Sequence, residues 1–269
     1  AGMQQFKPYF LGEQEPPARR LTTAQKCFRT SDIEEVGDST HDTFFEMLGN
    51  FSVGDYFKKE AIAFAWNLLV REWEIPPERL SITVFGGYES LPPDEEAEHL
   101  WKARDVPPER IFRFGPKDNF WGPPGVTGPC GPCSEIHYDL TQVPCSDPSC
   151  GPNCECGRFL EIWNLVFMEY NKQGQGNFDP LPSKNIDTGM GLERIALVLQ
   201  RKEDIFATDL FAPILEAVER LCRFSLKDAD EAVVRSSRVI ADHIRAATFL
   251  VSDGVLPSND GRGYVLRRI

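Results

Sequence analysis

Two stretches near the start of the chain have the composition of strands, and a polar loop separates them. Residues 26–30 and 43–53 contain the aromatic and apolar side chains that are typical of strands. Residues 31–42 are acidic and contain the turn formers glycine, aspartate and serine. The pattern predicts a hairpin whose long loop could bind a ligand.

Helical and strand patterns are mixed in the middle of the chain. Residues 55–73 place apolar side chains at helical spacing, with Asp55 as the candidate N-cap. The Pro-, Gly- and Cys-rich residues 115–158 are expected to be mostly loop. We also expect short strands at 80–86 and 110–115, a solvated helix at 93–105 and a central strand at 158–171.

The last third of the chain has helical periodicity. One helix is expected at 186–202, and two more at 209–224 and 236–254. Because strands and helices do not alternate strictly, the sequence favours an α+β fold over a doubly wound one. Composition shifts near Ser225, which predicts a first domain at 1–224 and an all-helical segment at 225–269.

Composition narrows the class of protein. The chain has 269 residues, of which 41% are hydrophobic and 11% aromatic, as in a packed globular protein. No apolar stretch approaches the roughly 20 residues of a membrane span, and no signal sequence is evident, so a cytoplasmic protein is expected. The net charge of −12 argues against coating nucleic acid by bulk electrostatics, although "GRGYVLRRI" supplies a local basic patch.

The stretch "IDTGMGLERIA", residues 186–196, combines groups suited to ligand binding. Asp187 could hold an ammonium group, and Gly189 lets the backbone approach a ligand closely. Arg194 lies nearly opposite the apolar stripe of the expected helix and needs an anionic partner. In the structural alternative, Asp187 is a helix N-cap and Arg194 pairs within its own helix.

The predicted hairpin carries three further candidates. Arg29 precedes the loop, His41 lies at its end, and Phe45 follows on the returning strand. They supply a cation for phosphate, a titratable donor and an aromatic face for a purine. In the alternative, Phe45 belongs to the core.

Five motifs occur in order along the chain: "CFRTSDIEEVGDSTHDTFFEMLGNFSVGDYFK", "TGPCGPCSEI", "EIWNLVFM", "DTGMGLER" and "PSNDGRGYVLRR". Together they resemble the catalytic region of the alanyl-tRNA synthetases, which are class II aminoacyl-tRNA synthetases. The resemblance covers the whole chain. It implies a class II antiparallel sheet flanked by helices, followed by the start of a helical tRNA-recognition domain.

The resemblance also implies an activity and a set of site residues. The enzyme would form alanyl-adenylate from L-alanine and ATP and transfer alanine to the acceptor stem of tRNA(Ala). Arg29 and Arg194 would be catalytic through the phosphates of ATP, which is assigned to Arg29, His41, Phe45 and Arg194. Alanine is assigned to Trp121, Asn164, Val166, Asp187 and Gly189. The tRNA is assigned to Asn259, Arg262, Arg267 and Arg268.

Further expectations concern metal, editing and the extent of the chain. Mg²⁺ should bridge the phosphates, with Glu135 and Glu161 left open as ligands. A pocket for alanine rejects glycine and serine poorly, so editing is expected in a later domain that this chain lacks. The family's first helix and strand are expected to precede this chain, and the sequence does not indicate an oligomeric state.

Four of the eight cysteines form a cluster with the spacing C-x4-C-x3-C-x-C. Four thiolates so close together could enclose one tetrahedral Zn²⁺, and reduced, unligated thiols are the alternative. The cluster consists of Cys145, Cys150, Cys154 and Cys156. The separate Cys130 and Cys133 are interpreted as loop structure.

Two other functions fit parts of the sequence. A non-catalytic RNA-binding or zinc-stabilised module could retain the fold, but it would be free to lose Arg29, Arg194 and Asp187. An amino acid:AMP ligase that loads another carrier would keep the chemistry without the tRNA. The basic C-terminal stretch speaks against that second alternative.

Overall fold

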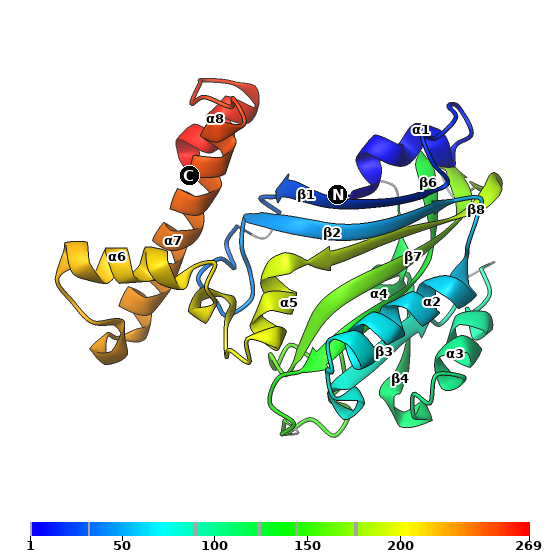
Figure 1. The fold of residues 1–269 in the computed structure, drawn as a ribbon, viewed down its shortest axis with the longest axis horizontal. Coiled ribbons are helices and arrows are strands. Elements are labelled where there is room, and N and C mark those ends of the chain that lie inside the picture. The colour runs from blue at the N-terminus through cyan, green and yellow to red at the C-terminus, as the bar shows by residue number, and fades with distance from the viewer. Residues whose placement is uncertain (1, 32, 89–90, 123–124, 144, 175–176) are drawn as a thin grey trace. The chain divides into compact units, whose positions relative to one another are not determined.

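The structure is a computed structural model of the chain (Figure 1). It describes all residues except 1, 32, 89–90, 123–124, 144 and 175–176. Within this described part, no helix is both long and apolar enough to cross a membrane.

The chain divides into two compact units. Unit 1 comprises Ala1–Gln25 and Met47–Gly191, and unit 2 comprises Lys26–Glu46 and Leu192–Ile269. These units are defined by contacts within the chain. The boundary expected near residue 225 separates two functional domains, and it stays a prediction.

A mixed sheet has the strand order β1-β2-β8-β7-β6-β3-β4, and the short β5 pairs with β6. The strands are β1 (Arg20–Phe28), β2 (Phe44–Val53), β3 (Leu80–Phe85), β4 (Ile111–Phe114), β5 (Phe120–Trp121), β6 (Gly128–Asp139), β7 (Phe159–Gln173) and β8 (Asn177–Gly191). Among the pairs with a described register, β3–β4 is parallel and the others are antiparallel. The α+β class and the largely antiparallel sheet are therefore confirmed.

β7 lies in the middle of this sheet, between β6 and β8 (Figure 1). Leu165, Val166 and Phe167 follow one another along it and are all buried, so both faces of the strand are covered. Branched and aromatic side chains suit such a strand because they pack well on a pleated surface. The predicted central strand is confirmed.

One face of the sheet in unit 1 is covered by the N-terminal helices η1 (Gly2–Phe6) and α1 (Lys7–Phe10). Their Met3, Phe6 and Phe10 share a hydrophobic cluster with Phe51 of β2 and Val166 of β7. The remaining helices of unit 1 are α2 (Lys58–Trp66), the π-helix η2 (Asn67–Glu72), η3 (Pro77–Arg79), α3 (Glu95–Lys102), η4 (Pro108–Arg110) and α4 (Pro116–Asn119).

The helices of unit 2 are α5 (Leu192–Leu199), η5 (Ile205–Ala207), α6 (Ala212–Cys222), η6 (Leu226–Asp228), α7 (Glu231–Ser252) and α8 (Gly261–Arg268). The predicted helices at 209–224 and 236–254 are confirmed as α6 and α7. The longer α7 begins at Glu231 because the Asp230 carboxylate caps it, accepting a hydrogen bond from the Val233 amide at 2.9 Å. Asp242 and Arg245 are buried on α7 among alanines, so this helix buries a polar pair as well as an apolar stripe.

Two sequence predictions are wrong. Residues 186–191 continue β8, and the helix begins only at Leu192, because this segment pairs with β2 and β7 on its two sides. Most of the described residues between 115 and 158 lie outside helices and strands, as expected, but the sequence analysis missed the twelve-residue β6 within this range. Asp55 does not cap α2, which begins after Phe57; its carboxylate accepts a hydrogen bond from Arg20 Nε at 2.8 Å instead.

Candidate active site

The residues assigned to alanine meet on one face of the sheet in unit 1. The register places Val166 of β7 opposite Asp187 of β8, and Asn164 opposite Gly189. Side chains two residues apart in a strand point to the same face, so these four positions share one surface. Phe51 of β2 is also opposite Asp187, which places the site beside the cluster covered by η1 and α1.

Asp187 is a buried acid in an apolar environment. Its side chain is only 7% exposed, and burial raises its pKa from 3.8 to about 7. Among the described residues, no cationic side chain forms an ion pair with Asp187. A ligand ammonium would supply the missing positive charge and favour the ionised carboxylate.

A series of hydrogen-bonded polar side chains begins at Asn164, two residues from Val166 on the same face of the sheet. Asn164 Nδ2 donates to Glu135 Oε1 at 3.0 Å, and Glu135 Oε2 is 3.1 Å from His137 Nε2. Burial raises the pKa of Glu135, although the hydrogen bond from His137 opposes that shift. In the described part of the chain, Asn164 Oδ1 and His137 Nδ1 are buried without a hydrogen-bond partner. Unsatisfied buried atoms are costly, which marks this series as a place where a ligand could bind.

Glu161 lies near the same series of polar side chains. The pairing of β6 with β7 skips Ile162 between Ile136 and His137, and this bulge puts Glu161 opposite His137. The negative charge of Glu161 contributes to the raised pKa of Glu135. Both candidate magnesium ligands are therefore in unit 1, Glu135 on β6 and Glu161 on β7, which also carries Asn164.

The walls around Asp187 are apolar and closely packed. Trp121 of β5 packs against the cluster that contains Val166. A Cβ atom built on Gly189 would lie 2.9 Å from Met47 Sδ, so a larger residue at this position would displace the flexible Met47 side chain. The arrangement suits a ligand with a small side chain.

A separate cavity, with a volume of about 690 Å³, lies over the opposite face of the sheet in unit 1. It lies between that face and the α2–η2 segment, and Leu48, Trp163 and Met190 line it. The described residues around it include none of those assigned to alanine. The candidate site is therefore defined by its polar groups and not by this cavity.

Unit 2 contains the residues assigned to ATP. The Arg29 guanidinium lies over the Phe45 ring, with its carbon 5.4 Å from the ring centroid. Arg29 N also donates to Thr43 O at 2.9 Å, which confirms that the strand ends on either side of the loop are neighbours. Phe45 is only 7% exposed, so the arginine shares a face of a largely buried ring.

His41 is held at the end of the loop by Asp38. The imidazole Nδ1 lies 2.6 Å from Asp38 Oδ2, and the amides of Thr40 and His41 both donate to Asp38 Oδ1 at 2.8 Å. Burial raises the pKa of Asp38, but the hydrogen bonds from His41 and Thr40 outweigh that effect and lower it to about 2. The position of His41 is therefore fixed by a carboxylate that stays ionised.

A buried charge network in unit 2 was missed by the sequence analysis. Arg245 Nη2 donates to Glu193 Oε1 at 2.6 Å, and its Nη1 donates to Phe44 O at 2.7 Å. On the same helix, Asp242 accepts from the amide of Thr43 at 2.8 Å and from its hydroxyl at 2.7 Å. The sequence signal for this network was two charged residues, Asp242 and Arg245, placed among the small residues on the buried face of α7.

Arg194 lies next to Glu193 and influences the same network. Burial raises the pKa of Asp42 well above its ordinary value, with Glu193 and Asp242 adding to the shift and the charge of Arg194 opposing it. Arg194 is therefore close to an acidic group from the loop that also carries His41. The structural alternative, in which Arg194 pairs within its own helix, stays a prediction.

The residues assigned to tRNA lie on and beside α8. Asn259, Arg262, Arg267 and Arg268 are all exposed. Arg267 Nη1 donates to Asn259 Oδ1 at 2.8 Å, which links the helix to the segment before it. Three exposed arginines form a local positive surface on a chain of net charge −12.

The chain belongs to the class II tRNA synthetases, because the family described as "tRNA synthetases class II (A)" matches residues 1–269. Within that class it is similar to curated alanine–tRNA ligases. It is 54% identical over 272 residues to that of Dehalococcoides mccartyi (strain BAV1), 52% over 276 residues to that of Rubrobacter xylanophilus, and 55% over 284 residues to that of Anaeromyxobacter sp. (strain Fw109-5). These alignments cover 100% of this chain and 30–31% of each relative, so the chain spans about 30% of their length.

Among solved structures, apo histidyl-tRNA synthetase of Staphylococcus aureus is 13% identical, with a TM-score of 0.39. That alignment covers 70% of this chain and 46% of the other. Family membership rests on the sequence relatives.

Proposed function

We propose that this chain is the part of an alanine–tRNA ligase that activates L-alanine with ATP and engages the tRNA(Ala) acceptor stem, in the cytoplasm. The observation that carries the proposal is the buried Asp187 carboxylate, which faces an apolar site without a cationic partner among the described side chains. The names of the relatives support alanine as the amino acid.

In the proposed reaction, alanine is recognised by unit 1. Asp187 holds the ammonium group, while Val166 and Trp121 form walls that suit a methyl group. Asn164 lies two residues from Val166 on the same face, and its side-chain oxygen has no hydrogen-bond partner among the described residues. Positioning of this kind is the main contribution that an enzyme makes when two substrates must be brought together.

The residues of unit 2 would hold ATP. Arg29 and Arg194 neutralise the phosphates, His41 contacts their distal end and Phe45 stacks on adenine. An oxygen of the alanine carboxylate attacks the α-phosphorus, and pyrophosphate leaves with the electron pair of the broken bond. Because both reactants are anions, electrostatic stabilisation is the chemistry that these cations must supply.

Mg²⁺ fits the donor chemistry of the site, since carboxylate oxygens are its usual protein ligands. Glu135 and Glu161 are the candidate ligands. When bound, the ion would neutralise phosphate charge. Zn²⁺ is expected at a different place, the cysteine cluster.

Two alternatives keep part of this picture. A non-catalytic binding module would tolerate loss of Arg29, Arg194 and Asp187, whereas this chain keeps all three in the matching motifs. An amino acid:AMP ligase for another carrier would not need α8, whose exposed arginines suit the phosphates of an acceptor stem.

The test is alanine-dependent exchange of pyrophosphate into ATP, followed by charging of tRNA(Ala), with the full-length protein. Asp187→Asn, Arg29→Ala and Arg194→Ala should each abolish exchange while the protein remains folded. Arg220→Ala, which changes an exposed arginine on α6, is the matched control and should retain exchange. Absence of exchange in the unmodified protein refutes the proposal, and exchange without charging favours the other carrier.

A further inference from the structure

The cysteine cluster lies in the connection between β6 and β7 of unit 1, and it includes none of the residues assigned to either substrate. This connection has little to pack by itself: of its two large aliphatic side chains, Leu140 at its start is half-buried and Val143 is 67% exposed. Exposed loops of this kind order poorly unless something ties them together. The four cysteines are the residues placed to do so.

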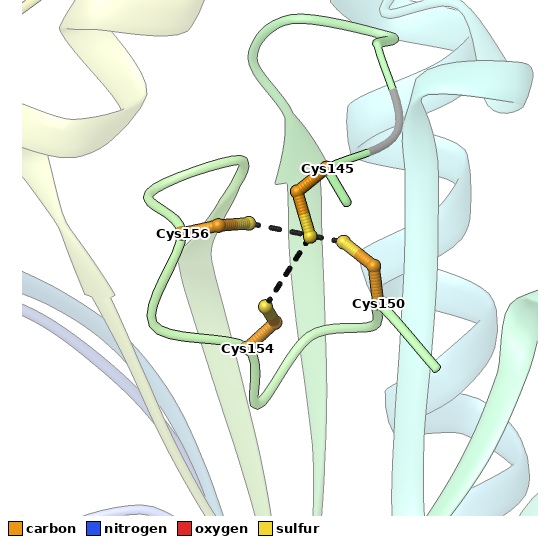
Figure 2. Close-up of side chains that lie close together, drawn as sticks. All are labelled: Cys145, Cys150, Cys154 and Cys156. Carbon is orange, nitrogen blue, oxygen red and sulfur yellow. Dashed lines mark hydrogen bonds between the residues drawn. The ribbon is translucent and has the colours of Figure 1, made fainter. Parts of the chain in front are cut away.

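Two turns in the connection present the cysteines to one another. The amide of Cys150 donates to Asp147 O at 3.1 Å, and the amide of Cys154 donates to Gly151 O at 2.9 Å. The Asp147 carboxylate also accepts from the amide of Ser149 at 2.8 Å. As Figure 2 shows, Cys145, Cys150, Cys154 and Cys156 all direct their sulfur atoms towards one point.

The distances between the sulfur atoms match the edges of a zinc-centred tetrahedron. Cys145 Sγ lies 3.8 Å from Cys154 Sγ, and Cys150 Sγ lies 3.8 Å from Cys156 Sγ. All four sulfur atoms lie within 4.8 Å of one another. A tetrahedron with Zn–S bonds of about 2.3 Å has S···S edges of about 3.8 Å. A disulfide requires about 2.05 Å, so these pairs are not disulfides.

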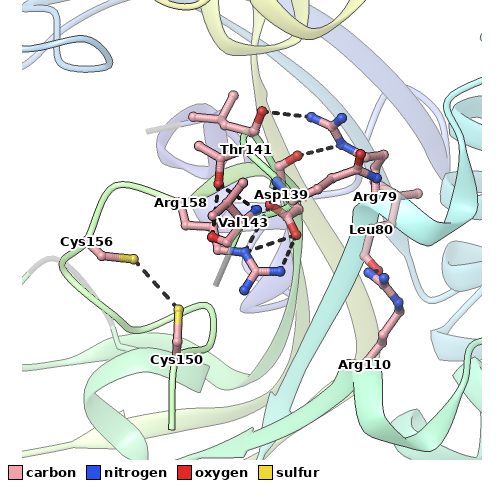
Figure 3. A network of polar contacts seen from close by, with 11 residues as sticks. Arg79, Leu80, Arg110, Asp139, Thr141, Val143, Cys150, Cys156 and Arg158 are labelled. Carbon is pink, nitrogen blue, oxygen red and sulfur yellow. Dashed lines mark hydrogen bonds and ion pairs between the residues drawn. The ribbon is translucent and has the colours of Figure 1, made fainter. Parts of the chain in front are cut away.

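The base of the connection is fastened by a separate set of contacts (Figure 3). Arg158 Nε lies 3.1 Å from both carboxylate oxygens of Asp139, the last residue of β6. Arg79 Nε donates to Asp139 O at 2.6 Å, and its Nη2 donates to Leu140 O at 2.9 Å. These contacts hold the end of β6 next to the start of β7. The residues between them depend on the cysteine cluster for their order.

We propose that Cys145, Cys150, Cys154 and Cys156 bind one structural Zn²⁺ ion that orders the β6–β7 connection. Four protein thiolates complete a tetrahedral coordination shell and leave no position for a substrate or water, which is typical of structural zinc sites. The charge of the ion offsets the repulsion among four thiolates. The site supports the hairpin that carries Glu135 and Asn164, but it takes no part in adenylate formation.

The first test is the metal content of the 269-residue chain, purified with reductant. Elemental analysis of that chain should find about one Zn²⁺. Replacement with Co²⁺ should give the visible bands of a tetrahedral ion and an intense sulfur-to-cobalt charge-transfer band. Zinc far below stoichiometry after incubation with ZnCl₂, stoichiometric iron, or disulfides found by mass spectrometry after alkylation would each overturn the proposal.

A variant locates the site. Cys150→Ser/Cys154→Ser should lose the zinc, become sensitive to proteolysis within residues 145–157, and keep alanine-dependent exchange at low temperature. Cys222→Ser is the matched control, because Cys222 is an exposed cysteine on α6, and it should keep the zinc and the proteolytic resistance. Zinc retained by the double variant refutes these ligands. If that variant does not fold, release of zinc from the unmodified chain by a mercurial reagent, at four thiols per ion, still tests the ligand set.

Discussion

The buried acids of the two units have different partners. Glu193 in unit 2 is ion-paired with Arg245, at 2.6 Å, whereas Asp187 in unit 1 has no such pair among the described side chains. Burial raises the pKa of both carboxyl groups, but in Glu193 the charge and the hydrogen bond of Arg245 oppose that shift. The comparison indicates that unit 2 uses its buried acid to hold the fold, whereas unit 1 keeps its acid available for a ligand.

The largest effect is expected from removing the cation that serves Glu193. Arg245→Met leaves a buried carboxylate unpaired, which should lower the free energy of unfolding by about 3–5 kcal/mol. Urea unfolding of the chain, followed by circular dichroism to report the helices of unit 2, measures the change. Lys26→Met is the matched control: it breaks the exposed pair with Asp253 and should cost below about 1 kcal/mol. Equal effects of the two substitutions would remove the distinction between the units.

The second effect concerns the pH dependence of stability. The pKa of Asp187 is 3.8 when exposed and about 7 in the folded chain. Between pH 3.8 and pH 7, Asp187 is therefore protonated in the folded state and ionised in the unfolded state. Ionising the buried group therefore costs stability as pH rises, by about 1.4 kcal/mol per pH unit across that interval.

Asp187→Asn does not titrate and should escape this cost. Its free energy of unfolding, relative to the unmodified chain, should increase from pH 4 to pH 7 and stay level above pH 7. Urea unfolding of both proteins at matched pH values measures this difference. A difference that does not change with pH would show that Asp187 has an ordinary pKa.

A smaller effect is expected from filling the space at Gly189. The added methyl group of Gly189→Ala would meet Met47 Sδ at 2.9 Å and displace that flexible side chain, which should cost about 1 kcal/mol, the low end for overpacking. The kcat/KM for alanine in the exchange assay should fall about 10- to 100-fold. Gly115→Ala, whose new methyl group meets nothing within 4 Å, should change little. Equal activity of both variants would argue that the alanine pocket lies elsewhere.

The smallest effect is expected at α8. Arg267→Ala should weaken tRNA binding by about 1 kcal/mol and reduce by about one the slope of log affinity against log salt concentration. Alanine-dependent exchange, which needs no tRNA, should be unchanged. An unchanged salt slope would show that this arginine does not contact a phosphate.

The sequence pattern predicted β7, whose residues have high strand propensity. It missed β6, where the close approach of a neighbouring backbone determines which residues fit. β7 was predicted because its branched and aromatic residues suit a strand. β6 begins with "GPCGPC", whose glycines and prolines are typical of loops. The structure shows why one of them is needed, since a Cβ atom on Gly131 would lie 1.9 Å from Phe167 O of the neighbouring strand. Such a close approach of two backbones cannot be read from local propensity.

The site residues that belong to sequence motifs could be predicted. The interaction partners that are distant in sequence could not. Asp187, Asn164 and Val166 came from motifs, and the strand register places them on one face. The partnership of Glu193 with Arg245 spans 52 residues, and that of Thr43 with Asp242 spans 199. Periodicity shows that a charged residue lies on a buried helix face, but not which residue neutralises it.

The most direct test of the central claim is the pH profile of alanine-dependent exchange. If Asp187 must be ionised to bind the alanine ammonium, kcat/KM for alanine should fall tenfold per pH unit below the pKa of about 7. Circular dichroism at each pH confirms that the protein stays folded. A profile that is flat between pH 5.5 and pH 8 would contradict the account, because it would mean that Asp187 is not the buried acid that receives alanine.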